Sequence, residues 1–203
     1  MRGALMALLL SAAPVMAEDW TSAGLTLEDG TALRPDDDRR LGLVNESLGA
    51  GLREAFADGA SADVDQVVAA LSAPSLDAEA TLQGIKGAWS CRMIKLGKIS
   101  PIIVYSPFKC RADGTEFEKL TGSQRTKGTL HHDGDRLVYL GTGFVAGESP
   151  VRYEDLPQNA DPQAVPQIMS EVGVVELTAP DRGRILFPNP YLESRMNILV
   201  LSR

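Results

Sequence analysis

The chain has 203 residues, of which 44% are hydrophobic and 23% are charged, and its formal net charge is −7. These proportions are ordinary for a globular protein, and they exclude collagen-like, mucin-like, coiled-coil and wholly disordered chains. The length predicts one domain, or one domain with an appendage. Aromatic residues make up only 5% of the chain, so its core must be built mainly from aliphatic side chains.

Residues 1–17 have the features of a secretory signal peptide. Arg2 supplies the positive charge, residues 5–10 form a short apolar run, and small residues precede a predicted cleavage after Ala17. The apolar run is too short to cross a hydrocarbon core of about 30 Å, and no later stretch is long enough. We therefore expect a periplasmic or secreted protein without a transmembrane segment.

Residues 18–85 are predicted to form a helical N-terminal segment that begins with an extended arm over residues 18–34. From residue 36 the apolar residues recur at three- and four-residue steps, which is the period of a helix. A first helix ending at Gly59 should bury one face, made of Leu41, Val44, Leu48, Leu52 and Phe56. A second helix, from Asp63 to Pro74, should bury Val64, Val67, Val68 and Leu71, and a third should cover residues 75–83.

Residues 86–203 are predicted to form an antiparallel β domain. Short strand-like runs are separated by turn residues, a pattern typical of a barrel or a sandwich, and Asp133-Gly134 marks the clearest hairpin turn. We expect an α+β fold in which N-terminal helices precede an eight-stranded antiparallel β-barrel. The strands are placed near residues 88–95, 102–111, 116–123, 126–132, 136–145, 172–178, 184–188 and 196–202.

Residues 146–171 interrupt this pattern. The segment carries four prolines and few apolar residues. A connection of this length inside a compact domain is usually functional or disordered. It is therefore either a lid or binding loop, or a plain surface excursion.

The two cysteines, Cys91 and Cys110, agree with export to an oxidising compartment. They lie 19 positions apart in neighbouring strand-like runs, so one cross-strand disulfide is geometrically plausible. Two free, buried thiols remain the alternative. A redox pair is disfavoured because the chain has no C-x-x-C motif.

Charge is distributed unevenly along the chain. Residues 86–127 hold nine Lys and Arg against three Asp and Glu, whereas residues 18–85 hold four against fourteen. One interpretation is that the acidic helices lie against the basic strands. The other is an open basic face, including Lys119, Arg125 and Lys127, that meets an anionic protein or envelope partner. Nucleic acid is not the expected partner, because the chain is acidic overall and lacks aromatics between its basic residues.

The sequence carries no strong catalytic or metal-binding motif. His131 and His132 are adjacent, so on a strand they point to opposite faces and do not chelate one metal together. Neither a nucleotide-binding loop nor G-x-S-x-G is present, and we expect no cofactor and no metal. A hydrolase that uses His131 or His132 with the 146–171 segment remains open, because a distant Ser or carboxylate could meet a His in space.

Four segments carry a family resemblance: GAWSCR at 87–92, IKLG at 94–97, FKCR at 108–111 and KLTGSQRT at 119–126. With these segments the chain resembles a bacterial exported family known as domain of unknown function 4893. The resemblance covers most of the mature chain and implies export and a helix-then-strand layout. It implies no activity and no site residues.

A looser resemblance begins at Trp89. A G-x-W motif that opens the first strand of an antiparallel barrel is similar to lipocalin-like (calycin) folds. The resemblance implies that a basic residue late in the barrel packs on Trp89, and Arg195 and Arg203 are the candidates. Core packing is one role for Trp89, and contact with a ligand at the base of the barrel is the other.

These observations favour an exported, non-enzymatic binding or interaction protein of the cell envelope. The candidate ligand- or partner-binding residues are Trp89, Lys119, Arg125 and Lys127. A carrier of a small apolar ligand, of lipocalin type, is the alternative among binding proteins. An envelope hydrolase is the alternative among enzymes.

Cleavage after Ala17 is directly testable. Expression with the native N-terminus in a bacterial host should yield envelope protein whose first residue is Glu18, because the small residues before Ala17 suit a signal peptidase. N-terminal sequencing and intact mass measurement check this. Recovery of the chain from the cytoplasm with residues 1–17 attached would contradict it.

Overall fold

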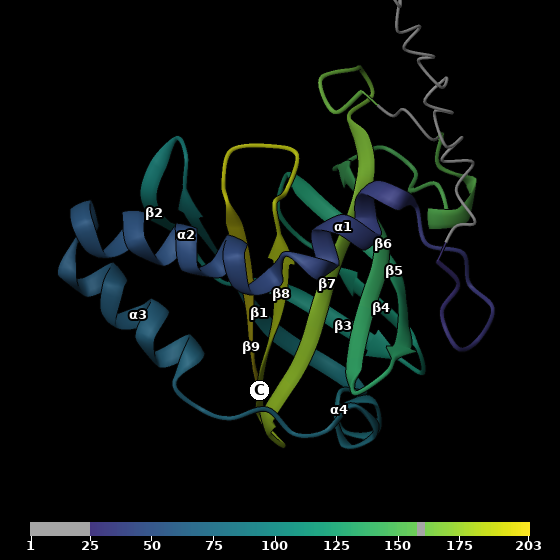
Figure 1. The fold of residues 1–203 in the computed structure, drawn as a ribbon, viewed down its shortest axis with the longest axis horizontal. Coiled ribbons are helices and arrows are strands. Elements are labelled where there is room, and N and C mark those ends of the chain that lie inside the picture. The colour runs from purple at the N-terminus through teal and green to yellow at the C-terminus, as the bar shows by residue number, and fades with distance from the viewer. Residues whose placement is uncertain (1–24, 158–160) are drawn as a thin grey trace, which may run out of the picture.

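The computed structural model describes residues 25–157 and 161–203. The predicted signal peptide and the first part of the predicted arm lie outside these residues. The described chain folds as a closed antiparallel barrel with helices packed on its outer wall and across one end (Figure 1). The expected α+β class is therefore confirmed.

All neighbouring strands of the barrel pair antiparallel, and pairing of the first strand with the last closes the sheet. Short runs of alternating polarity form the strands, as the sequence predicts. Their bounds are β1 Gly87–Gly97, β2 Ser100–Val104, β3 Phe108–Asp113, β4 Glu116–Lys119, β5 Gln124–Asp133, β6 Arg136–Val145, β7 Ile168–Ala179, β8 Arg182–Pro188 and β9 Met196–Ser202.

The predicted strand 102–111 is broken into β2 and β3. β2 and β3 both pair with the same edge of β1: β2 pairs with residues 94–97 and β3 with residues 87–91. The other edge of β1 pairs with β9. Pro107 lies in the break and has no N–H to donate to a ladder. The two pieces share one strand position, so the barrel has the expected eight positions.

The long connection is shorter than predicted, since β7 already begins at Ile168. Within it, Tyr153–Asp155 form a 3-10 helix, and Tyr153 and Leu156 are buried. The hairpin at Asp133-Gly134 is confirmed, with Asp133 paired to Arg136 across the turn.

One end of the barrel interior is packed solid, and we call this end the floor. Its side chains come from the inward-facing positions of all strands except β2, and the Cys91–Cys110 disulfide, with a Cα–Cα distance of 5.9 Å, lies among them. The disulfide prediction is thus confirmed. Tyr139 occupies the centre and meets Phe117 and Phe187 edge-on, with ring centroids 5.8 and 5.9 Å away. This geometry is favourable for aromatic rings.

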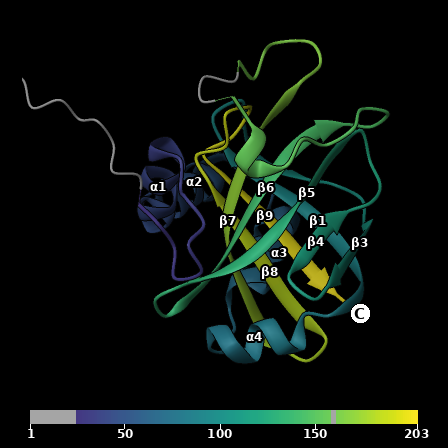
Figure 2. The same ribbon diagram turned by 90° about the vertical axis from the view of Figure 1, so that its right-hand side faces the viewer.

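The helix α4, Ala78–Gly84, covers the floor (Figure 2). Asp77 caps it by accepting a hydrogen bond from the Ala80 N–H at 2.7 Å. At its other end the Arg203 guanidinium donates to the carbonyl oxygens of Gly84 and Lys86 and lies 4.1 Å from the Trp89 ring. Arg203 is therefore the basic residue on Trp89 that the lipocalin resemblance implied.

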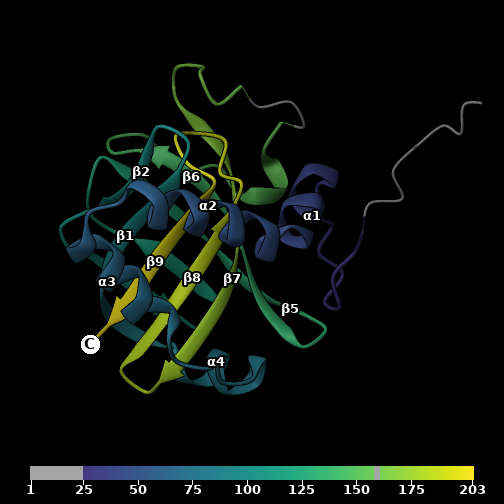
Figure 3. The same cartoon turned by 60° about the vertical axis from the view of Figure 1, so that its left-hand side comes forward.

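Two helices, α2 Val44–Asp58 and α3 Ser61–Leu71, pack on the outer wall over β1, β2, β8 and β9 (Figure 3). The buried row of α2 is made of small residues, Ser47, Gly51 and Ala55, with Leu48 and Leu52 at its flanks. The prediction was wrong for Phe56 and Val68, which are 56% and 48% exposed. The barrel wall is close enough that only small side chains fit beneath the centre of α2.

The predicted first helix is two helices, because the chain turns at Leu43 between α1, Pro35–Gly42, and α2. The turn allows α1 to lie on β7, where Asp37 is fully buried. Ser170 and Tyr153 donate hydrogen bonds to its carboxylate at 2.9 and 2.7 Å, and Arg40 forms an ion pair with it. Residues 25–34, predicted as an extended arm, form a short hairpin with a bridge between Thr26 and Ala32.

Gly49 and Gly51 provide a matched test of this packing. A Cβ at Gly51 would lie 2.9 Å from the Cβ of Leu96, whereas a Cβ at Gly49 meets nothing within 4 Å. Gly49→Ala should raise the free energy of unfolding by about 0.5–1 kcal/mol through helix propensity. Gly51→Ala should lower it, because overpacking costs about 1–3 kcal/mol. Denaturant unfolding checks both, and equal stabilities would contradict the packing.

Candidate functional site

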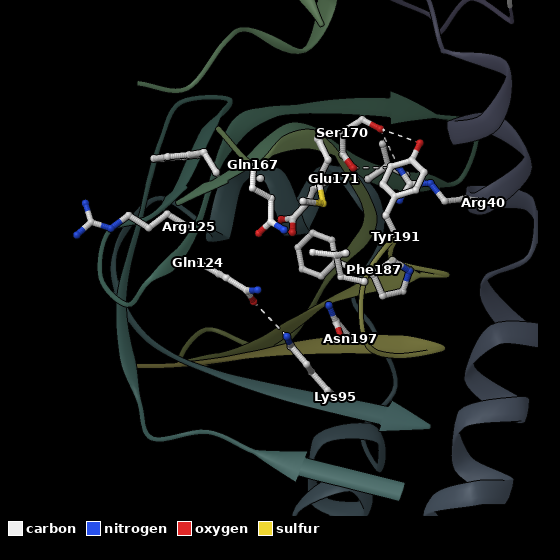
Figure 4. A pocket seen from close by; sticks show the side chains of 16 residues that line it. Arg40, Lys95, Gln124, Arg125, Gln167, Ser170, Glu171, Phe187, Tyr191 and Asn197 are labelled. Atoms are coloured by element: carbon white, nitrogen blue, oxygen red, sulfur yellow. Dashed lines mark hydrogen bonds between the residues drawn. The ribbon is translucent and has the colours of Figure 1, made fainter. Parts of the chain in front are cut away.

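The other end of the barrel interior, its mouth, is polar and hollow. On several strands the inward-facing positions change from apolar at the floor to polar at the mouth. On β1 Lys95 follows Met93, and on β4 Lys119 follows Phe117. The side chains at the mouth enclose a cavity of about 280 Å³, which we call the mouth chamber. It is lined by Met93, Lys95, Tyr105, Phe108, Lys119, Ser123, Gln124, Arg125, Thr126, Glu171 and Asn197. A smaller pocket shares five of these residues and extends to Tyr191 (Figure 4).

Glycines on β6 make room for the large side chains around the chamber. A Cβ at Gly141 would lie 2.1 Å from the Tyr139 hydroxyl, and one at Gly143 would lie 3.0 Å from the Glu171 carboxyl group. The Gly141-Thr142-Gly143 sequence is thus a close-packing feature that lets Tyr139 and Glu171 occupy the barrel interior.

Lys95 is compensated inside the chamber. Its ammonium forms an ion pair with Glu193 and donates to Gln124 Oε1 at 3.1 Å. Only 6% of the residue is exposed. These partners explain how a lysine is tolerated on the inner face of β1.

Lys119 has only neutral partners among the described residues. Its ammonium donates to the backbone carbonyls of Thr121 and Gln124 and lies 3.8 Å from the centroid of the Phe108 ring. Burial is the main cause that lowers the pKa of Lys119 to about 8; the charge of Glu171 opposes this change, and the positive charges of Arg125 and Lys95 add to it. The chamber therefore holds an ammonium whose charge is poorly neutralised.

Glu171 lies inside the barrel opposite the two lysines. Burial raises its pKa, and hydrogen bonding to Thr126 together with the charges of Arg40, Lys119 and Lys95 limits the increase. The Thr126 hydroxyl in turn lies 2.6 Å from the Tyr139 hydroxyl. Burial also raises the pKa of Tyr139, so this group remains a neutral hydrogen-bonding partner.

The three cations predicted to share an open face are separated. Lys119 is 4% exposed and lies inside the barrel, contrary to the prediction. Arg125 is at the rim of the mouth, where its Nε donates to the Gly122 carbonyl and its guanidinium points away from the chamber (Figure 4). Lys127 is exposed on the outer wall. Strand alternation is the reason, since Thr126 faces inward and its neighbours must face outward.

Ion pairs between the acidic helical segment and the basic strands do not hold the helices on the barrel either. Among the described residues, no ion pair joins an acidic residue of 25–85 to a Lys or Arg of 86–127. The helix α2 uses Glu54 instead, which pairs with Arg195 in the turn before β9. Arg195, the second candidate for packing on Trp89, has this role.

Trp89 belongs to the floor and lies away from the mouth chamber. It is 3% exposed, and its indole N–H donates to the Ile85 carbonyl at 2.6 Å. Inside the barrel Trp89 packs in one cluster with Ile85, Leu201 and the disulfide. It also borders an outer groove of about 620 Å³ together with Phe108 and Leu120. The core-packing role is the one that these contacts support.

The two histidines lie on opposite faces of β5, as predicted. His131 is on the outer wall, with Nδ1 2.6 Å from Asp29 Oδ2 and Nε2 2.6 Å from Thr129 Oγ1. The hydrogen bond from His131, together with that from the Thr31 N–H, lowers the pKa of Asp29 to about 2. His132 lies 3.6 Å from Glu79 of α4. His131 therefore anchors the hairpin of residues 26–32 to the barrel.

His131 also lines an outer groove of about 1010 Å³ between this hairpin, β5 and residues 150–156. The hydrolase hypothesis required a His within reach of a carboxylate in a cleft, and His131 meets that requirement. Within the described residues there is no group of three or more His, Cys, Asp or Glu placed to hold a metal ion.

Of the residues that line the chamber, sequence reasoning named only Lys119 and Arg125 as binding residues; among those it missed are Lys95, Gln124, Glu171 and Asn197. For Lys95 a signal was present, because Trp89, Cys91, Met93 and Lys95 share one strand face. Glu171 was assigned to the loop, so its inward position on β7 was not foreseen. In the part of the chain that the structure describes, no helix has the length and apolar character needed to cross a membrane.

Comparison with known proteins identifies a family. The family model described as Domain of unknown function (DUF4893) matches residues 31–201, a range that includes the four helices and the strands of the described chain except the last residue of β9, Ser202. No curated protein and no solved structure matches the chain.

Proposed function

The chain belongs to the family described as Domain of unknown function (DUF4893), and we propose that it is an exported, non-enzymatic binding protein that takes up a small molecule in its mouth chamber. The observation that carries this proposal is the division of the barrel interior. The floor is packed with aromatic and aliphatic side chains, whereas the mouth holds a cavity of about 280 Å³. A barrel of eight strands is wide enough for one small ligand.

The lining of the chamber is that of a binding site. Met93, Tyr105 and Phe108 provide apolar surface, and Lys95, Lys119 and Gln124 provide polar groups. Small-molecule sites combine a mostly apolar wall with a few placed polar groups that set orientation. The charges favour an amphipathic ligand over the purely apolar ligand of the lipocalin-type alternative.

Export is part of the proposal and rests on two features. Residues 1–17 have the sequence of a signal peptide, and the Cys91–Cys110 disulfide suits an oxidising compartment such as the periplasm. An anionic protein partner in the envelope is the other form of binding that the sequence suggested. Lys86, Lys98, Lys109 and Lys127 are exposed lysines of the basic block and are available to such a partner.

A plug at the mouth tests the chamber. Ser123 is exposed at the rim, and its side chain makes no hydrogen bond within the described residues. Ser123→Trp should abolish uptake of the neutral fluorescent probe N-phenyl-1-naphthylamine, because the indole would cover the opening. Thr115→Trp, in the exposed turn between β3 and β4 at the floor end, should bind like the wild type. Fluorescence titration measures both, and equal probe binding by wild type and Ser123→Trp would refute the site.

A hydrolase at the outer groove is the second candidate function. The Asp29–His131–Thr129 hydrogen bonds have the order of a carboxylate, a base and a hydroxyl nucleophile. If this arrangement is catalytic, hydrolysis of p-nitrophenyl acetate should exceed the buffer rate. The excess should disappear in Thr129→Val, which keeps the side-chain shape, and persist in His132→Asn. A wild-type rate equal to the buffer rate would exclude an esterase at this groove.

A further inference from the structure

We propose that the ligand of the mouth chamber carries one anionic group, such as a carboxylate, on a small apolar body. This inference rests on the proposed function and specifies the ligand class of the same site. It follows from the chamber lining, where two amide NH₂ groups and the Lys119 ammonium lack a carboxylate partner among the described residues, and Glu171 is the one carboxylate of these residues that lines the cavity.

The amide groups show the imbalance most clearly. Gln124 Oε1 accepts from Lys95, and Asn197 Oδ1 accepts from the Ser194 hydroxyl at 2.6 Å. Their NH₂ groups have no partner among the described residues. Asn197 is buried, with 7% of the residue exposed, whereas Gln124 is exposed at the rim. Both side chains line the cavity (Figure 4). A ligand with acceptor oxygens would satisfy these donors.

The charges point the same way. The ammonium of Lys95 has the carboxylate of Glu193, but Lys119 has no carboxylate within 4.0 Å in the described chain. Arg125 at the rim is likewise without an ion pair there. An anion near Lys119 would gain a charge-assisted hydrogen bond in a partly desolvated site. Arg125 would attract the same anion from solution without holding it.

The apolar part of the ligand has a defined place. Tyr105 and Phe108, with ring centroids 6.4 Å apart, line the chamber together with Met93. Lys119 lies against the face of Phe108, so an anion near this ammonium leaves its apolar body next to the rings. The negative charge of Glu171 repels an anion. Removing this charge should therefore strengthen anion binding, whereas removing the charge of Lys119 should weaken it.

Probes that differ only in head group test the inference: octanoate, octanol and octylammonium, and benzoate, benzyl alcohol and benzylammonium. Titration calorimetry at pH 7 on the full mature protein should show at least about tenfold tighter binding of a carboxylate than of its alcohol, and no binding of the ammonium compounds. Equal affinity for carboxylate and alcohol would overturn the anion inference and leave the proposed function standing. Tighter binding of an ammonium compound would overturn it as well.

Substitutions within the chamber give effects of opposite sign. Lys119→Met should weaken carboxylate binding at least about tenfold and leave alcohol binding unchanged, whereas Glu171→Gln should strengthen carboxylate binding. Lys127→Gln, on the outer wall, is the matched control and should change neither. Because Lys119 also holds the turn between β4 and β5, circular dichroism must show that its variant is folded. If the Lys119→Met variant is unfolded, the effect of Glu171→Gln on carboxylate binding decides whether the anion inference holds.

The pH dependence supplies an independent measurement. Raising the pH through the Lys119 pKa of about 8 removes its positive charge, while the ligand carboxylate stays ionised. The groups that face this ammonium are Arg125, Lys95 and Glu171. Carboxylate affinity should therefore fall between pH 7 and 9, and Lys119→Met should lose this fall. If none of the six head-group probes binds but the protein still takes up N-phenyl-1-naphthylamine through its mouth, the anion inference alone is refuted. If N-phenyl-1-naphthylamine does not bind either, the proposed function is refuted too.

Discussion

A charged side chain inside a closed barrel must find partners there, because water does not surround it. This requirement shapes the whole mouth of the barrel. Lys95 is matched by Glu193 from the turn before β9, and Lys119 by the carbonyl oxygens of the turn between β4 and β5. Gly143 gives the Glu171 side chain room, since a Cβ there would lie 3.0 Å from its carboxyl group. The turns at the mouth are therefore folded around the ammonium groups to which they supply hydrogen-bond acceptors.

The floor follows the opposite rule and admits almost no polar group. The Tyr139 hydroxyl reaches Thr126, and the Trp89 indole reaches a backbone carbonyl, so both large side chains are buried with satisfied polar atoms. Arg203 then closes the floor from outside by binding Trp89 and the end of α4. This division places the mouth chamber at the end of the barrel opposite the packed floor.

The helical segment is fastened to the barrel at two kinds of contact. Under α2 the contact is close and made by small residues, whereas under α1 it is polar and centred on the buried carboxylate of Asp37. A buried carboxylate with several hydrogen bonds is costly to strip of one partner. The Asp37 contacts also reach Tyr153, so they position the segment that borders the outer groove.

The sequence by itself determined the order of helices and strands, the turn at Asp133-Gly134 and the Cys91–Cys110 pair, because local periodicity and turn chemistry report these directly. The tertiary structure decided which side chains meet across the barrel. Lys119 and Lys127 look alike in the sequence, yet one faces the chamber and the other faces outward. Phe56 has the spacing of a core residue, but the closeness of the wall to α2 selects Ala55 instead. Closure of the sheet brings Lys95, Glu171 and Asn197 together from strands far apart in sequence. No local sequence pattern shows that these three side chains line one cavity.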